Sequence, residues 1–461
     1  MHGLVSLNTT DMLRWILGGR EAPGAVEKSP VMVIGEEQPK NVFTELQVLK
    51  GHYDIVRFLV QIDDLRFASG GDDGLVLVWN IQTGECLQEL RGHTQQITAV
   101  AVYSGPTDGT HVHLLTASSD RALSMWDPDT GNRVKTVSDL LSSAKCLLVL
   151  HHLDLWISGG NEMCMWDRNF SLLWRTDHHS DAGISAMIEL PKNCIAAAVD
   201  KEIVIYRLNI ASSEEDTTVS EICRLTDHQD SIRALISVSD QLFVSGSHVG
   251  ELIVWDSLNW SVQASERILW GEPRPAPQAE IKLGAQKQSE MSVRHLASDG
   301  ELIVAAVGSG LYVYNVMRKS VVAYRKTAHD SNVLHTLLLP DGQLMSCSED
   351  GSVRMWELQD LPLPAEPASA GFFGMWTFGR SSKQTNQTMK KAQEILGLRM
   401  LELTGDLIGH SGAVQMFISM GERGLVTCST DHLVIAWKNG KRESQLRSFD
   451  LFCKLEQNGG L

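Results

Sequence analysis

Short apolar runs with the alternation of β-strands recur along this chain, and eight of them end in an aromatic residue at a near-regular interval. Successive aromatic positions lie 40 to 59 residues apart, except for one gap of 81 residues before the last. A period near 40 residues that closes on a tryptophan is typical of the four-stranded blades of a β-propeller. The positions are Trp79, Trp126, Trp166, Tyr206, Trp255, Tyr314, Trp356 and Trp437. We therefore predict an all-β propeller of eight four-stranded blades, with seven blades as the alternative if the sixth unit is irregular.

Four of the repeats share a histidine, a hydroxyl residue, an aspartate and a tryptophan at fixed spacing. In each, the tryptophan lies six residues after the aspartate and ten after the serine or threonine. These groups can form one chain of hydrogen bonds, so that no polar group is left unpaired between buried strands. We call such a set a staple and predict that it is structural. The four staples are His52, Ser69, Asp73 and Trp79; His93, Thr116, Asp120 and Trp126; His329, Ser346, Asp350 and Trp356; and His410, Thr427, Asp431 and Trp437.

The other four units depart from this pattern. The third has a shortened turn, the fourth ends in Tyr206, and the sixth keeps only its strand pattern. The fifth keeps His228, Ser245 and Trp255, but Val249 stands at the aspartate position. A Ser, His and Asp in one unit could also suggest a nucleophilic triad, yet a catalytic site needs one constellation and this chain has four equivalent ones. We therefore expect no enzyme activity, no metal and no cofactor.

The Gly-His pairs, turn aspartates and closing Trp-Asp pairs resemble the WD-repeat family, over roughly residues 42–440. A propeller ring must close so that no strand edge is left unpaired. Residues 43–49 alternate suitably just before Gly51-His52, so we expect them to form the outer strand of the last blade. The strand order of the family places the extra residues before Trp437 between the third and fourth strands of the seventh blade.

These observations divide the chain into an N-terminal arm (1–41), a propeller (42–440) with a long flexible loop at about 359–400, and a tail (441–461). The loop contains an unusual aromatic segment, Gly371 to Arg380, with four aromatic residues in ten. It either folds back onto the propeller wall or forms an exposed motif that enters a partner's cavity. The candidate binding residues are Phe372, Phe373, Met375, Trp376, Phe378 and Arg380.

The tail has apolar residues at every third position, which could place them on one face of a short helix. They are Leu446, Phe449, Phe452 and Leu455. This face either packs beneath the propeller or contacts a partner, and the sequence leaves both alternatives open.

Composition restricts the function further. A net charge of -16 and a pI near 5.4 argue against nucleic acid as a partner, because phosphate binding needs an excess of lysine and arginine. The eight cysteines contain no CxxC pair, and we expect them to be buried free thiols. No apolar run reaches the 18 residues or so that a membrane span requires, and the short run near Trp15 lacks a basic leader. We therefore expect a cytoplasmic protein without direct membrane insertion.

Several stretches resemble one subgroup of the WD-repeat family, among them SGSHVGELIVWD, SCSEDGSVRMWEL and GFFGMWTFGR. That resemblance implies a non-catalytic scaffold that joins two DENN-domain proteins in a complex linked to small-GTPase regulation, autophagy and lysosomal nutrient signalling. It also implies recruitment to the lysosomal membrane surface through a cationic amino acid transporter. The aromatic segment then becomes the transporter-binding motif.

Two rival functions remain. Substrate receptors of cullin ubiquitin ligases resemble this chain in fold, but they often carry arginine two residues after a Trp-Asp pair. Here Asp129, Asn169 and Leu258 stand at those positions, which counts against this alternative. An enzyme that uses the central channel would need converging ionisable side chains, and the sequence offers no such cluster with a recognisable spacing.

Overall fold

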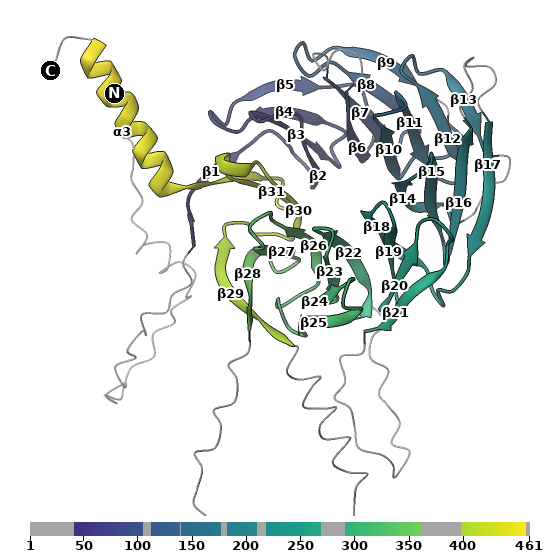
Figure 1. Cartoon of the computed structure of the whole chain (residues 1–461). Helices are drawn as coiled ribbons and strands as arrows, with labels where there is room; N and C mark the ends of the chain where they lie inside the picture. The colour runs from purple at the N-terminus through teal and green to yellow at the C-terminus, as the bar shows by residue number, and fades with distance from the viewer. Residues whose placement is uncertain are drawn as a thin grey trace, which may run out of the picture. The chain divides into compact units, whose positions relative to one another are not determined.

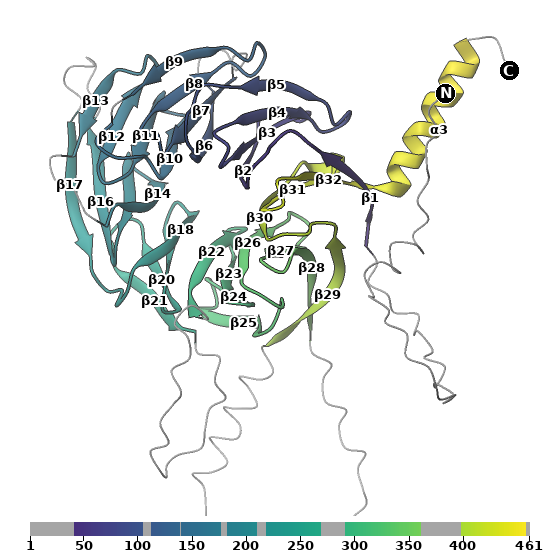
Figure 2. The ribbon, with the colours of Figure 1, turned by 180° about the vertical axis from the view of Figure 1, so that it is seen from behind.

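The computed structural model describes residues 41–104, 112–138, 140–176, 182–209, 218–268, 291–360 and 398–457. The chain separates into Met1–Gln38 and a compact unit of Pro39–Leu461, and every described element belongs to the second. This unit consists of eight four-stranded antiparallel sheets arranged as the blades of a ring (Figures 1 and 2). The prediction of eight blades is confirmed, and the alternative of seven is wrong.

The first four blades follow one another along the chain, each from its inner to its outer strand. Blade 1 contains β2 (Val56–Gln61), β3 (Arg66–Gly71), β4 (Val76–Asn80) and β5 (Cys86–Leu90); blade 2 contains β6 (Ile97–Ser104), β7 (Val112–Ser118), β8 (Leu123–Trp126) and β9 (Arg133–Val137); blade 3 contains β10 (Cys146–Leu150), β11 (Leu155–Gly159), β12 (Met163–Asp167) and β13 (Leu172–Arg175); blade 4 contains β14 (Ile184–Leu190), β15 (Cys194–Val199), β16 (Glu202–Asn209) and β17 (Thr218–Leu225).

The sixth unit, which the sequence left uncertain, is as regular as the others. Blade 5 contains β18 (Ile232–Ser239), β19 (Leu242–Ser247), β20 (Glu251–Asp256) and β21 (Val262–Arg267); blade 6 contains β22 (Val293–Ser298), β23 (Leu302–Val307), β24 (Gly310–Asn315) and β25 (Ser320–Arg325); blade 7 contains β26 (Val333–Leu338), β27 (Leu344–Ser348), β28 (Ser352–Asp360) and β29 (Arg399–Ile408); blade 8 contains β30 (Val414–Ser419), β31 (Leu425–Ser429), β32 (Val434–Asn439) and β1 (Phe43–Leu49). A short 3-10 helix (Gly421–Arg423) and α3 (Gly440–Gln457) complete the described elements.

The second and third strands of each blade are buried on both faces, because each blade is covered by its neighbours. In β4, Val76 to Trp79 are all buried, whereas the outer strand β5 is mostly exposed. The core therefore lies between blades rather than within one layer, as repeat architectures require. One apolar cluster joins Leu49, Val56 and Trp79 to Val426, across the junction of blades 8 and 1.

The N-terminal strand β1 closes the ring, as predicted. It pairs antiparallel with β32, with Leu46 opposite Trp437 and Leu49 opposite Val434. Blade 8 is thus built from the two ends of the propeller sequence. The closure covers the edge of β32, which would otherwise present a row of unpaired backbone groups.

The long insertion lies between β28 and β29, the third and fourth strands of blade 7. The two strands pair up to Asp360 and Arg399, whose side chains form an ion pair with 2.8 Å between Arg399 Nε and Asp360 Oδ1. The insertion therefore begins and ends at one point on the outer edge of the blade. The aromatic segment 371–380 lies outside the described residues.

Candidate functional site

Each of the four staples predicted from the sequence is a continuous chain of hydrogen bonds. In blade 1, Trp79 Nε1 donates to Ser69 Oγ at 2.8 Å, and the two ring nitrogens of His52 lie 2.8 Å from Ser69 Oγ and 2.8 Å from Asp73 Oδ2. Asp73 also accepts backbone N–H groups from Tyr53 and Leu75. The His52 and Asp73 side chains are buried. The staple thus joins the loop before the blade to its second and third strands.

The other three staples repeat this geometry. The tryptophan donates to the hydroxyl at 2.8 or 2.9 Å, and the histidine contacts the hydroxyl at 2.7 or 2.8 Å and the aspartate at 3.0 or 3.1 Å. The four equivalent copies lie in the consecutive blades 7, 8, 1 and 2, where each is suited to holding its blade together. A reaction would instead need one set of converging groups.

The structure contains a fifth staple that the sequence analysis missed. In blade 5, His228 lies 2.6 Å from Ser245 Oγ and 3.1 Å from Glu251 Oε2, and Trp255 Nε1 donates to Ser245 at 2.8 Å. Glu251 stands two residues beyond Val249, and its longer side chain reaches the position that aspartate occupies elsewhere. An acidic residue at the start of the next strand, near an otherwise incomplete His–Ser–Trp set, was the signal available in the sequence.

The fifth staple predicts a stability effect at a residue outside the repeat pattern. Glu251→Ala would leave His228, the Gln229 N–H and the Ser247 hydroxyl without their common acceptor. We expect the free energy of unfolding to fall by about 1 to 3 kcal/mol. Val249→Ala, at the nominal aspartate position, is the control and should cost clearly less in denaturant unfolding. Equal losses in the two variants would contradict the assignment.

The remaining blades replace the staple in different ways. In blade 3, Trp166 Nε1 still donates to Ser158 Oγ at 2.9 Å, although the two residues are only eight positions apart. In blade 6, the buried Tyr314 hydroxyl has no hydrogen-bond partner among the residues that the structure describes. The Tyr314 ring packs in an apolar cluster that includes Ile303 and Ala305 of the neighbouring strand β23. Apolar packing between blades therefore suffices where the polar set is missing.

Burial shifts the pKa of the staple residues. Burial lowers the pKa of His93, His228 and His410 from the ordinary 6.5, although the neighbouring carboxylates act in the opposite direction. Burial alone would raise the pKa of Asp350, but hydrogen bonds from His329 and Ser352 outweigh it and hold the pKa well below its usual range. The native state therefore favours neutral forms of His93, His228 and His410 and the ionised form of Asp350.

These shifts predict that the propeller loses stability in mild acid. The unfolded histidines bind protons near pH 6.5 and the buried ones resist, so their contribution is complete above that pH and is lost as the pH falls below it. The aspartates add a second loss below about pH 3.8, their unfolded value. We expect a lower melting temperature at pH 5.5 than at pH 7.5, as measured by thermal unfolding, with a smaller difference in His228→Gln. A melting temperature independent of pH over this range would contradict the prediction.

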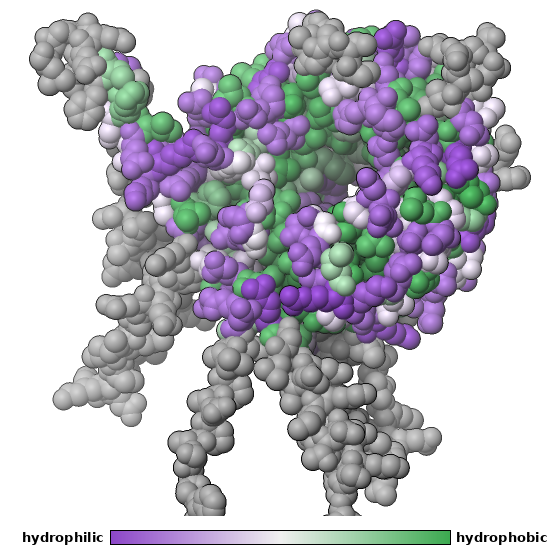
Figure 3. Space-filling view, viewed as in Figure 1, coloured by the Kyte–Doolittle hydropathy of each residue, from purple (hydrophilic) through white to green (hydrophobic). Residues whose placement is uncertain are grey.

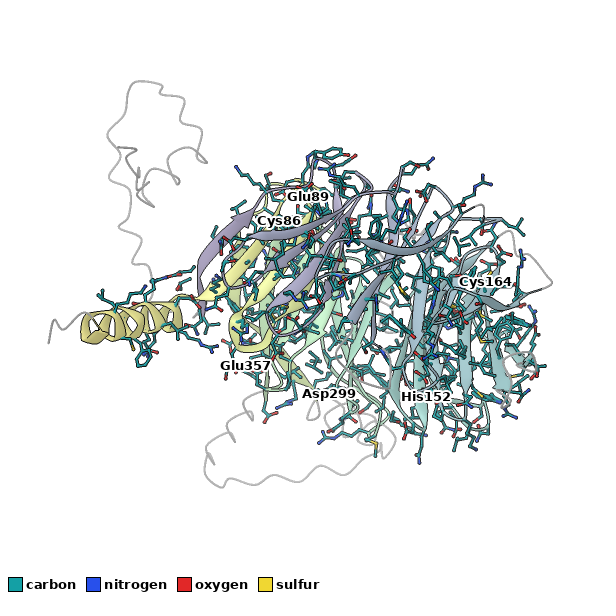
Figure 4. All side chains as sticks on the ribbon, turned by 90° about the horizontal axis from the view of Figure 1, so that it is seen from above. Cys86, Glu89, His152, Cys164, Asp299 and Glu357 are labelled. Atoms are coloured by element: carbon teal, nitrogen blue, oxygen red, sulfur yellow. The ribbon has the colours of Figure 1, made fainter. Side chains whose placement is uncertain are left out.

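All eight cysteines are free thiols. Four of them are buried as expected, namely Cys164, Cys194, Cys347 and Cys428, while Cys146, Cys223 and Cys453 are only partly buried. The expectation is wrong for Cys86, which is exposed on the outer strand β5 beside Glu89 (Figure 4). Partial burial of the Cys86 sulfur and the nearby Glu89 carboxylate both raise the pKa of this thiol. The reactive thiolate form is therefore disfavoured, although the residue is exposed. Across the described ranges, no cluster of three or more His, Cys, Asp or Glu could hold a metal ion.

The tail forms α3, an 18-residue helix that begins directly after β32. Asn439 Oδ1 accepts the backbone N–H of Arg442, which satisfies a donor of the first turn. A Cβ at Gly440 would collide with the Thr44 hydroxyl, so the helix starts tight against β1. Arg447 then forms a two-point ion pair with Glu45 on β1.

Beyond its first turn, α3 exposes its apolar residues to solvent. Leu446 is 49 % exposed, Phe449 69 % and Leu451 59 %. Packing beneath the propeller is therefore wrong for Leu446 and Phe449, while the side chains of Phe452 and Leu455 lie outside the described residues. On β1, the edge strand beside the helix, Leu46 and Val48 are also exposed. We call these exposed apolar residues of β1 and α3 the closure surface.

The structure offers no evidence on the candidate loop residues 372–380, all of which lie outside the described ranges. Of the helices that the structure describes, none has the length and apolar character of a membrane span. Two surfaces thus remain as candidates for partner binding: the closure surface, which is described, and the aromatic segment, which is known from its sequence alone.

Comparison with known proteins places these features in a family. A model of the WDR41 β-propeller family matches residues 12–447. The chain is 56 % identical to WD repeat-containing protein 41 of Homo sapiens and 54 % identical to that of Mus musculus, in each case over 98 % of this chain and 99 % of the relative. The crystal structure of the computationally designed Ika8 protein is similar in fold, with a TM-score of 0.60 and 19 % identity, over 85 % of this chain and 98 % of the design.

Proposed function

Because the chain belongs to the WDR41 family of β-propellers, we propose that it is the scaffold and targeting subunit of a complex with two DENN-domain proteins. In this proposal the propeller performs no reaction. The closure surface binds the DENN-domain partners, and the aromatic segment binds a cationic amino acid transporter of the lysosome. The complex would then act in small-GTPase regulation, autophagy and lysosomal nutrient signalling.

The observation that carries the proposal is the exposure of α3. A helix of this length gains little stability from its own hydrogen bonds in water and normally depends on packing of an apolar face. Here the described side chains from Ser444 to Phe449 are all exposed. The helix contacts the propeller near its start, at β1 and β32 and through an ion pair between Arg442 and Glu422. Large apolar groups held away from the core in this manner are suited to contact with a partner.

Strand β1 supports the same assignment. One edge of β1 pairs with β32, and it is the last strand of its sheet, so its other edge has no strand partner among the described residues. Exposed edge strands are common sites for the addition of a partner's strand, in which backbone hydrogen bonds supply affinity. The neighbouring Leu46 and Val48 would add apolar contacts. The closure surface therefore offers two recognised modes of binding side by side.

The position of the loop supports a separate targeting role. Its two ends meet at Asp360 and Arg399 on the outer edge of blade 7, so the residues between them interrupt neither the ring nor its core. A partner bound there would leave the closure surface in blade 8 available. The chain could therefore hold its DENN-domain partners and its transporter at the same time.

Co-purification tests the proposal. The double variant Leu446→Glu/Phe449→Glu should lose the DENN-domain partners, with affinity reduced at least about tenfold, because two apolar contacts are replaced by charges. Its melting temperature should stay at the wild-type value, since neither side chain packs on the propeller. The matched control is Leu87→Glu/Leu172→Glu, two exposed leucines on the outer strands of blades 1 and 3. Wild-type retention of the partners by the helix variant would refute the proposed interface.

A further inference from the structure

The inner strands carry a repeated irregularity at one end of the channel. In seven blades the pairing of the first and second strands slips by one residue near the start of the first strand, as between Val56 and Phe58 in blade 1. A bulge leaves its extra residue unpaired and redirects its side chain. The bulge residues are Arg57, Thr98, Ser185, Arg233, Arg294, Leu334 and Gln415.

Four of these bulge residues line one cavity of about 450 Å3. Arg233, Arg294, Leu334 and Gln415 come from blades 5, 6, 7 and 8, so the cavity lies where four consecutive blades meet at the channel. Figure 3 shows the ring hollowed near its centre. The remaining residues that line the cavity are His248 and Ser292, which are hydrogen-bonded to each other with 3.1 Å between His248 Nδ1 and Ser292 Oγ.

The cavity carries positive charge that the surrounding described residues balance only in part. It has two guanidinium groups and no carboxylate among its lining residues. Among the described residues, the buried Arg294 Nε atom has no hydrogen-bond partner, and the guanidinium forms an ion pair with 3.5 Å between Arg294 Nη1 and Glu349 Oε1. Within the described ranges, no hydrogen bond or ion pair holds the exposed Arg233 side chain.

In blade 1, the arginine at the same bulge position is paired with a carboxylate. Arg57 donates two hydrogen bonds to Asp72, from Nε at 2.6 Å and from Nη2 at 2.7 Å. The geometry of the strand start thus allows a two-point contact between a bulge arginine and a carboxylate. In blade 5 the described residues supply no equivalent of Asp72 for Arg233. In blade 6, Glu349 contacts Arg294 Nη1 at 3.5 Å but leaves Arg294 Nε without a partner.

We propose that this cavity binds an acidic peptide segment of a partner protein, with a carboxylate held between Arg233 and Arg294. The planar guanidinium fork matches a carboxylate at two points, as Arg57 and Asp72 show within this chain. Leu334 and the Gln415 amide complete the lining with one apolar and one polar group. These suit an aliphatic side chain and a backbone group of a peptide better than an ion that is charged on every side. The residues of this site are not those of the closure surface.

Fluorescence anisotropy with a labelled peptide tests the proposal on the full chain. The probe is Gly-Leu-Glu-Glu-Leu-Gly, and its twin carries glutamine in place of both glutamates. We expect the acidic peptide to bind and Arg233→Gln to weaken it about tenfold, the usual range for loss of a charged hydrogen bond. The melting temperature of the Arg233→Gln protein should equal that of the wild type, because the Arg233 side chain has no partner among the described residues. Arg57→Gln removes the same charge from the same position in blade 1, where Asp72 already occupies the guanidinium, and should change affinity by less than about twofold.

Three results would overturn the proposal. The first is equal binding of the glutamine twin, which would mean that no carboxylate is recognised. The second is an equal loss in Arg57→Gln and Arg233→Gln, which would indicate a general charge effect rather than a site. The third is displacement of the peptide by inorganic phosphate at a lower concentration than by acetate at matched ionic strength, which would make this a phosphate site.

Discussion

Removal of residues 1–50 should prevent the chain from folding into a soluble propeller, whereas removal of residues 1–38 should leave it folded. The two deletions differ by the segment that contains β1, which pairs with β32 along Phe43 to Leu49. Without β1, the edge of β32 becomes free to pair with another chain, and such edges are sites of aggregation. Leu49, which is 3 % exposed and packs in the cluster with Val56 and Trp79, would also be lost from the core.

The measurement is the soluble yield of each deletion, followed by gel filtration and thermal unfolding. The deletion of residues 1–11 should also be tolerated. The larger deletion is expected in the insoluble fraction or in aggregates. A monomeric product with the melting temperature of the full chain would show that the ring does not depend on its N-terminal strand.

Much of the fold could be predicted because the propeller repeats its chemistry. The spacing of Ser69, Asp73 and Trp79 recurs in three further blades, and a hydrogen-bond chain between buried strands needs those residue types at those positions. The closing strand followed from the same reasoning, since a ring without it would leave an edge unpaired. Local spacing and one global requirement, closure, together defined the architecture.

The fifth staple could not be predicted from spacing because side-chain length can replace chain position. Glu251 has one more methylene than aspartate, and it reaches His228 from two residues further along the strand. Six residues before Trp255 the chain has Val249, so the spacing of the other staples predicts no acidic partner for His228. In blade 6 the reverse holds, since apolar packing around Tyr314 forms a regular blade with no staple at all.

The candidate surfaces were harder to predict, because periodicity does not say what covers a face. Apolar residues at every third position indicated a helical face in the tail, but the same spacing fits a face packed on the propeller and one open to solvent. The structure decides this for Leu446 and Phe449, which are exposed. The channel cavity was missed for another reason, since bulges displace Arg233 and Arg294 by a shift in strand register that leaves no mark in the sequence.

Alanine at Trp376 should sharply weaken recruitment to the lysosomal surface and leave the propeller as stable as before. Trp376 lies in the aromatic segment, outside the described residues, and prolines and polar residues flank the segment in sequence. If the segment is a tethered motif, ordering it costs free energy on binding, so affinity must be concentrated in a few large anchors such as Phe373, Trp376 and Phe378. Loss of the indole should then cost about 2 kcal/mol or more, roughly thirtyfold in affinity.

A tryptophan of the propeller wall gives the matched control. Trp174 on β13 packs edge-on against Tyr206 of the next blade, with 6.1 Å between the ring centres, so Trp174→Ala should lower the melting temperature and leave recruitment unchanged. Measuring both quantities on both variants separates a binding motif from a packing segment, because the two roles predict opposite pairs of results. If Trp376→Ala behaves like Trp174→Ala, the aromatic segment folds back onto the wall and the targeting role must lie elsewhere in the chain. If it loses recruitment alone, the anchors act on the partner, and their spacing in the segment becomes the feature to vary next.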